Sequence, residues 1–399
     1  MNRPAIILLR KALGLILASG ATVFAETQPT PAEISIAKAQ EKVSQQPDRV
    51  ANYDSLAMAY ARRARETSDV VYYQKAEETL ERAFELAPDD LEAAKVRTWL
   101  LLGRHEFAKA LSAATKLNRK VPDDVTVFGY LADANTELGN YQDALESVQW
   151  MLNLRPGNIP GLTRAAYQRE LHGDIAGAID LMQRAHDSTP FQELEDRAWI
   201  LTQIGHLYLL EGNLKDAELY AKGALDLFEG YHYAQGTLAQ ILMEQKRYDE
   251  AIALLKARFR AAPHAENLYS LGEALERAER HDEASDAFRK FEPMALSESG
   301  ITDNANHELI AYYVDFAKQP DKALKVAEQE LARRRDVFTL DCHAWALAAN
   351  GNYAAAAAEI RLALAVGVKD PRILEHARVI ESHLRESIAA NFAPAVAPR

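Results

Sequence analysis

The chain has 399 residues, 48% of them hydrophobic, and a formal net charge of −12. The apolar content can fill a large core, and 18 Gly with 15 Pro are too few for a collagen-like or disordered chain. A chain this acidic repels phosphate backbones, so we expect no nucleic-acid partner. Cys342 is the single cysteine, which excludes a disulfide within the chain and a zinc site of paired cysteines.

Residues 1–25 have the pattern of a secretory signal peptide. A basic start precedes the apolar run from Ala12 to Val23, and small residues mark a cleavage site near Ala25. The run is shorter than the roughly 20 apolar residues that span a bilayer comfortably. We therefore expect a periplasmic or secreted protein with no stable membrane span after cleavage. An N-terminal segment that stays uncleaved and anchors the protein in the membrane is the alternative.

Beyond a linker expected at residues 26–33, an alanine recurs every 33 to 39 residues. The recurring residues are Ala76, Ala110, Ala144, Ala178, Ala217, Ala251, Ala284, Ala323 and Ala356. Each is followed four residues later by a residue that can pack, the spacing of one face of an α-helix. Proline follows twelve residues after five of them and predicts the end of that helix.

A second helix is predicted before each recurring alanine. Phe128, Leu131, Ala132 and Asn135 lie on one helical face, and the same spacing returns in later repeats. Gly139-Asn140 and its equivalents then fall between the two helices, where glycine accepts the left-handed turn that ends the first helix. The pattern predicts a series of helical hairpins that bury their apolar faces only by stacking on one another.

This pattern resembles the tetratricopeptide repeat family, and the resemblance implies an all-α, α–α superhelical solenoid with about nine repeats and a capping helix at each end. The solenoid is expected at residues 34–389, with an N-terminal helix from about Pro31 to Gln46, a C-terminal cap at 373–389 and a disordered tail at 390–399. The repeats are expected at residues 50–88, 89–122, 125–158, 159–190, 198–230, 232–264, 265–297, 304–336 and 337–369. Extra residues precede the fifth and eighth repeats, and Pro293 to Asn304 reads as a solvated connection, a hinge or a binding loop.

No spacing in the sequence points to catalysis or to a metal. His307-Glu308 begins like a zinc-protease helix, but Ala311 stands where the second ligand would be. His376 and His383 lie about 10 Å apart along a helix, too far for one ion. Cys342 reads as a half-buried filler of a helix, with a reactive thiol or an intermolecular pairing as the alternatives. We expect no enzyme activity, no metal and no cofactor.

In this family the first helix of each repeat lines the concave surface, and the lining positions follow the packing residues by one. Acidic and aromatic residues recur at these positions, and none of the positions read this way is Lys or Arg. The candidate partner-binding residues are Asp133, Tyr167, Glu170, His206, Gln240, Tyr269, Glu273, Glu276, Glu308, Tyr312, Asp315, Asp341 and Trp345. Such a lining suits a basic peptide. An acidic protein whose aromatic residues pack sideways on the next repeat would show the same pattern.

The sequence therefore predicts a non-enzymatic interaction scaffold or adaptor of the cell envelope, with a segment of another protein in its concave groove. The alternative is a structural subunit of an envelope assembly that uses its edges and caps. Mutations in the groove would abolish binding by an adaptor, whereas mutations in the terminal helices would disrupt an assembly subunit.

Overall fold

The computed structural model describes residues 29–67, 69–301 and 304–392. The expected signal peptide and residues 393–399 of the expected tail lie outside this part. The described part contains twenty α-helices, a π-helical turn and no strand, which confirms the expected all-α fold. The elements are α1 (Pro31–Gln45), α2 (Val50–Thr67), α3 (Val71–Leu86), α4 (Leu91–Gly103), α5 (Phe107–Lys120), α6 (Val125–Glu137), α7 (Tyr141–Leu154), α8 (Ile159–Leu171), α9 (Ile175–Ser188), α10 (Leu194–Leu210), α11 (Leu214–Leu227), α12 (His232–Glu244), α13 (Tyr248–Ala261), α14 (Ala265–Arg277), α15 (His281–Glu298), α16 (Asn306–Ala311), the π-helical turn η1 (Tyr312–Phe316), α17 (Pro320–Leu331), α18 (Val337–Ala349), α19 (Tyr353–Ala365) and α20 (Pro371–Phe392).

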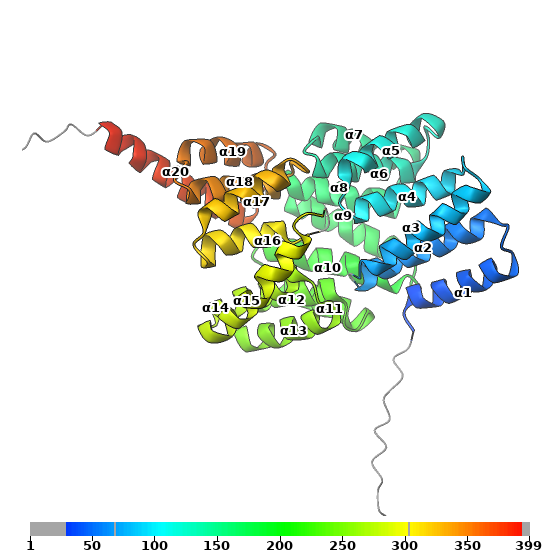
Figure 1. Ribbon diagram of the computed structural model, residues 1–399, viewed down its shortest axis with the longest axis horizontal. Coiled ribbons are helices and arrows are strands. Elements are labelled where there is room, and N and C mark those ends of the chain that lie inside the picture. Colours follow the sequence, from blue (N-terminus) through cyan, green and yellow to red (C-terminus); the bar gives the residue numbers. More distant parts are fainter. Residues whose placement is uncertain (1–28, 68, 302–303, 393–399) are drawn as a thin grey trace, which may run out of the picture.

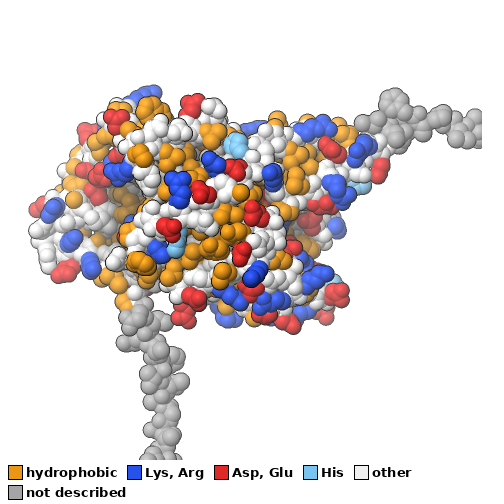
Figure 2. All heavy atoms as spheres, turned by 180° about the vertical axis from the view of Figure 1, so that it is seen from behind, with side chains coloured by type: hydrophobic (Ala, Val, Ile, Leu, Met, Phe, Trp, Pro, Cys, Tyr) orange, Lys and Arg blue, Asp and Glu red, His pale blue; other side chains and the backbone are white. Residues whose placement is uncertain are grey.

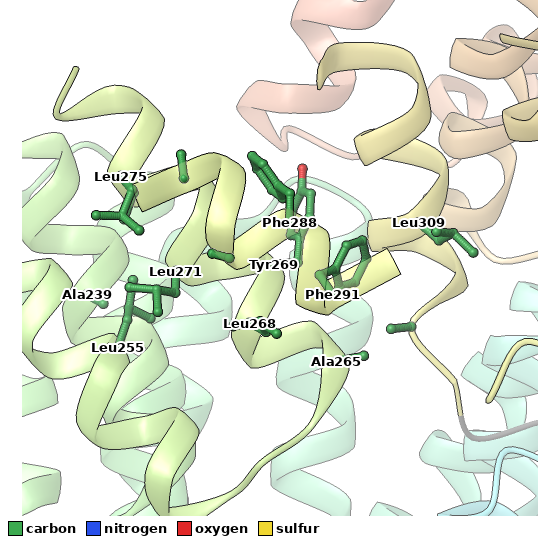
Figure 3. Packing of buried hydrophobic residues seen from close by; sticks show 14 of the residues in the cluster. Ala239, Leu255, Ala265, Leu268, Tyr269, Leu271, Leu275, Phe288, Phe291 and Leu309 are labelled. Atoms are coloured by element: carbon green, nitrogen blue, oxygen red, sulfur yellow. The ribbon is translucent and has the colours of Figure 1, made fainter. Parts of the chain in front are cut away.

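The recurring alanines lie where consecutive helices touch. All nine have 0% of their surface exposed, and the residues four positions later are buried as well. A methyl group at this position lets the paired helices approach closely, and larger residues then fill the space between hairpins. Figure 3 shows such a core between α12 and α16, where Tyr269, Phe288 and Phe291 meet. The packing register expected from the sequence is the register of the structure.

Short polar residues start many of the helices. Asp90, Asp124 and Asn158 each accept a hydrogen bond from a backbone N–H in the first turn of the helix that follows. Glycine ends the first helix of four hairpins with φ between 75° and 79°, at Gly139, Gly173, Gly212 and Gly351. Four other hairpins place a larger residue at this left-handed position: His105, Lys246, Glu279 and Lys318.

Several element boundaries differ from the expected ones. Helix α1 starts at Pro31, where the N-terminal helix was expected, and Thr30 and Glu33 form a capping box there, so the linker expected to run to residue 33 ends before this helix. Helix α10 takes up part of the extra residues before the fifth repeat, and α15 continues through Pro293 to Glu298. The end of α15 is held by Arg333, which donates hydrogen bonds to the carbonyl oxygens of Ser299, Gly300 and Ile301.

The hairpins follow a curved path that returns to its own earlier part. In Figure 1, α17 to α19 lie beside α6 to α8, although α8 ends at Leu171 and α17 begins only at Pro320. Leu171 at the end of α8 belongs to the same buried cluster as Val337, Leu340 and Ile373. The solenoid therefore packs against itself.

Candidate functional site

A large hollow in the described part lies inside the curve of the second half of the chain. This central cavity has a volume of about 990 Å³ and is bounded by α10, α12, α14, α16, α18 and the first turns of α20. A cavity of this size is at the upper end of the range for binding sites of small molecules and short segments. Its walls carry apolar residues such as Met243, Phe316 and Phe338 between the charged groups.

One wall of the central cavity is a chain of four polar and aromatic side chains. The indole Nε1 of Trp345 donates a hydrogen bond to Asp315 at 2.9 Å. The Trp345 ring is stacked on His376, with centroids 4.1 Å apart and planes 7° apart. Nδ1 of His376 lies 2.9 Å from Asp341. These contacts tie η1, α18 and α20 together and fix the orientation of the Trp345 ring.

Glu308 is a half-buried carboxylate on the wall of the central cavity. The structure shows no hydrogen bond or ion pair between this carboxylate and another side chain of the described residues. Burial, followed by repulsion from Glu266, raises the pKa of Glu308. A positively charged group brought into the cavity would stabilise its ionised form.

Three arginines also face the central cavity, and sequence reasoning missed them. Arg258 comes from the second helix of its hairpin, and its side chain lies across Gly236. A Cβ added to Gly236 would be 3.0 Å from Cζ of Arg258. Arg277 pairs with Glu244 at 2.9 Å, and Arg372 pairs with Glu273 at 3.5 Å. The signal that could have revealed Arg258 is the glycine at a lining position, which leaves room for a long side chain.

The central cavity is therefore acidic but mixed in sign. Its acidic lining residues are Glu211, Glu244, Glu273, Glu308, Asp315, Asp341 and Asp370, against the three arginines, a formal charge of −4 when every carboxyl group is ionised and the histidines are neutral. Arg258 lies on a second helix and Arg372 on the capping helix, so neither was among the positions read from the first helices, and Arg277 is the last residue of α14. On the surface shown in Figure 2, acidic and basic side chains are likewise interspersed.

Most of the candidate residues from the sequence line this one cavity: His206, Gln240, Tyr269, Glu273, Glu308, Asp315, Asp341 and Trp345. Asp133 and Tyr167 line a smaller cavity of about 340 Å³ in the first half of the chain. Asp133 is bound there by Arg164, which donates to both of its carboxylate oxygens.

Three candidate residues lie outside both cavities. Glu170 is 9% exposed and bonds Nε2 of His206 at 3.2 Å. Glu276 turns toward Nδ1 of His281 at 2.7 Å. Tyr312 packs on Phe288 and Phe291 in the core, at the residue where the π-helical turn starts.

A further cavity of about 760 Å³ lies at the other end, among α1, α2, α4, α6, α8 and the start of α10. Arg65 is held there by ion pairs to Glu195 and Asp196. Leu171 at the end of α8 packs in the buried cluster of α18 to α20, and the cavities of the described part have separate linings. The candidate residues therefore do not all line one groove.

The chemistry of the described residues gives no metal site and no membrane span. No three His, Cys, Asp or Glu side chains among them converge on a point that could hold an ion. No helix in this part is long and apolar enough to cross a bilayer. Cys342 lies half-buried in α18, and burial raises the pKa of its thiol well above the usual value, which disfavours the reactive thiolate.

Two models of the tetratricopeptide repeat match the chain, at residues 99–158 and 208–273. The chain is a tetratricopeptide repeat protein. These repeats build protein-interaction scaffolds in general, and the structure presents such a scaffold. No curated protein sequence matches the chain.

Solved structures show the same tetratricopeptide repeat fold at low sequence identity. A human IFIT1 dimer with m7Gppp-AAAA is 14% identical over 86% of this chain and 96% of that chain, with a TM-score of 0.51. A monomeric IFIT1 mutant with Gppp-AAAA is 15% identical over 83% and 86%, with a TM-score of 0.53. The chain spans 55% of the matched chain of the Cut9–Hcn1 hetero-tetramer, at 13% identity and a TM-score of 0.47.

Proposed function

We propose that this protein is a non-enzymatic adaptor of the cell envelope that holds a basic segment of a partner protein in the central cavity. The observation that carries the proposal is the lining of that cavity: a net charge of −4, apolar walls, and Glu308 without an ion-pair partner among the described residues. A lysine or arginine of the partner would pair with Glu308, and the apolar walls would take the flanking residues. The envelope location rests on the pattern of a signal peptide at residues 1–25.

The lining argues against a phosphate-rich ligand. The IFIT1 structures contain capped oligonucleotides, but seven acidic residues face this cavity against three arginines, each of which already has an acidic neighbour within 3.5 Å. An RNA backbone would meet net repulsion here. A protein segment fits the cavity better than a nucleic acid does.

The test is capture of partners from an envelope extract with residues 26–399 and two matched charge reversals. Glu308→Lys changes the cavity, whereas Asp226→Lys makes the same change on an exposed residue of α11. We expect a partner that is retained by the native chain and by Asp226→Lys, lost with Glu308→Lys, and bound more weakly as salt rises, because partly exposed charges are screened. Equal capture by all three chains would refute binding in the cavity.

A separate observation supports the alternative role, in which the protein is a subunit of an envelope assembly and uses its edges and caps. Ile34 on α1 and Leu374 on α20 are 41% and 46% exposed, which leaves apolar surface on both terminal helices. Loss of the partner with Leu374→Asp, together with full retention by Glu308→Lys, would favour the assembly subunit over the adaptor.

A further inference from the structure

The self-contact of the solenoid is made by a short segment between α17 and α18. Arg334 forms an ion pair with Glu137 at the end of α6. The backbone N–H of Arg335 donates to the carbonyl oxygen of Glu137 at 3.1 Å. The N–H of Val337 donates to the hydroxyl of Tyr141 at 2.9 Å. The side chain of Val337 is buried in the same cluster as Leu171 of α8. Two main-chain donors, the cation of Arg334 and the apolar side chain of Val337 thus contact a distant repeat.

These contacts are those of a peptide docked on a repeat rather than of two stacked hairpins. The Arg335 amide precedes α18 and the Val337 amide is the first of this helix, so neither has a carbonyl partner within the helix. The guanidinium of Arg334 lies 5.3 Å from the centroid of the Phe107 ring, a cation–π distance. Its side chain is 17% exposed and also bonds Asp336.

The surface that receives this segment is shaped for close approach. Gly139, in the turn after α6, lies so near that an added Cβ would be 2.7 Å from the carbonyl oxygen of Arg335. The cavity of about 340 Å³ lies directly beside Arg334, so the receiving surface extends past the residues that now occupy it. Tyr167 lines this cavity and also packs against the buried cluster of α18 to α20.

We propose that Phe107, Glu137, Tyr141 and Tyr167 form a second binding surface, which the chain's own residues 334–337 occupy in the closed form. The partner that fits is a segment with an arginine followed within three residues by an apolar side chain. Its binding displaces residues 334–337 and opens the solenoid between α6–α8 and α17–α19. The proposal is independent of the central cavity, because none of these four residues lines that cavity.

Opening has a direct readout in two amide protons. Inside α18, amides are protected by the helix, but those of Arg335 and Val337 are protected by Glu137 and Tyr141 alone. Their hydrogen exchange therefore reports the contact and not the unfolding of a hairpin. Arg334→Glu would place a third acid against Glu137 and Asp336 and open the contact. Arg289→Glu, on an exposed residue of α15, changes the net charge equally and leaves the contact intact.

The experiment combines exchange with a peptide probe, the synthetic segment of residues 331–340. We expect exchange at both amides to be at least tenfold faster in Arg334→Glu than in the native chain or in Arg289→Glu. The peptide should bind Arg334→Glu at least tenfold more tightly than the native chain, whose tethered segment competes at a high effective concentration. The same peptide with Arg334→Ala should lose this binding.

The closed contact and the second binding surface each have an outcome that would overturn them. Unchanged exchange in a folded Arg334→Glu chain would overturn the closed contact, and the absence of peptide binding to that variant would overturn the second surface. If Arg334→Glu does not fold, Tyr141→Phe removes only the acceptor of Val337 and should speed exchange at Val337 alone. Equal exchange at Val337 in Tyr141→Phe and the native chain would then count against the proposal. Failure of the Glu308→Lys test leaves all these results unaffected.

Discussion

Trp345 on α18 and His376 on α20 are stacked face to face, and one ring nitrogen of each is bound to an aspartate. The stack joins the last repeat to the capping helix and forms a wall of the central cavity. Because the N–H of Trp345 has its partner in Asp315, the ring cannot turn without breaking a charge-assisted hydrogen bond. The wall is thus ordered before any partner arrives.

Replacing Trp345 by phenylalanine should keep the stack and remove the hydrogen bond to Asp315. We expect Trp345→Phe to lower the free energy of unfolding by about 1–3 kcal/mol, because a half-buried carboxylate loses its donor. In a background with Asp315→Ala, the loss of unfolding free energy caused by Trp345→Phe should be smaller by about 1 kcal/mol. Urea unfolding of the four chains measures this coupling, and strict additivity would show that the bond contributes nothing.

Lys246 occupies the left-handed turn between α12 and α13 with φ of 61°, where other hairpins have glycine. Since a side chain costs about 1–2 kcal/mol in this conformation, Lys246→Gly should raise the free energy of unfolding by up to about 1 kcal/mol. Gly212→Ala is the reverse change at the equivalent turn. An added Cβ at Gly212 would meet no atom within 4 Å, so backbone strain alone should destabilise that variant by about 1 kcal/mol.

Thermal unfolding of the two chains checks the paired prediction. The two midpoints should move in opposite directions from that of the native chain. A fall in the midpoint for Lys246→Gly would mean that contacts of the lysine outweigh the strain.

The packing register could be predicted from the sequence because it rests on single residue types at fixed spacing. Only a methyl group fits where Ala144 or Ala217 meets the neighbouring helix, and this requirement leaves a visible period. The first helices that line the interior follow from the same period. Tyr312 is an exception, because it packs into the core beside Phe288 and Phe291.

The contact of the solenoid with its own earlier part could not be predicted in this way. Glu137 and Arg334 are 197 residues apart, and their contact depends on the curvature accumulated over several repeats. Small rotations between neighbouring hairpins add up along a solenoid, and no single repeat encodes the sum. Arg258 was missed for a related reason, since it reaches the cavity from the second helix of a hairpin.

The signal-peptide pattern makes a prediction about processing. When the full chain is expressed in a bacterium and the envelope fraction is purified, the protein should begin near Glu26. N-terminal sequencing or intact mass measures this directly. A chain that starts at Met1 in that fraction would instead support the uncleaved anchor, and one found only in the cytoplasm would contradict export.

Asp54 on α2 is 9% exposed, and one of its carboxylate oxygens is buried without a hydrogen-bond partner in the described structure. Burial, with repulsion from Asp90 and Glu92, raises the pKa of Asp54 from 3.8 to about 6. A raised carboxyl pKa in the folded state means that ionisation costs stability. The cost is absent below about pH 4, grows as the pH rises toward 6, and is constant above that value.

Asp54→Asn should therefore leave stability nearly unchanged at pH 4 and raise the free energy of unfolding by about 1–3 kcal/mol at pH 7 and above. Asp226→Asn, on an exposed residue, should show no such difference between the two pH values. Urea unfolding at pH 4, 5.5 and 7 follows the change, since the gain for Asp54→Asn must appear between the first and the last. A gain of the same size at all three values would mean that the amide forms a new hydrogen bond and that the charge of Asp54 has no part in the effect.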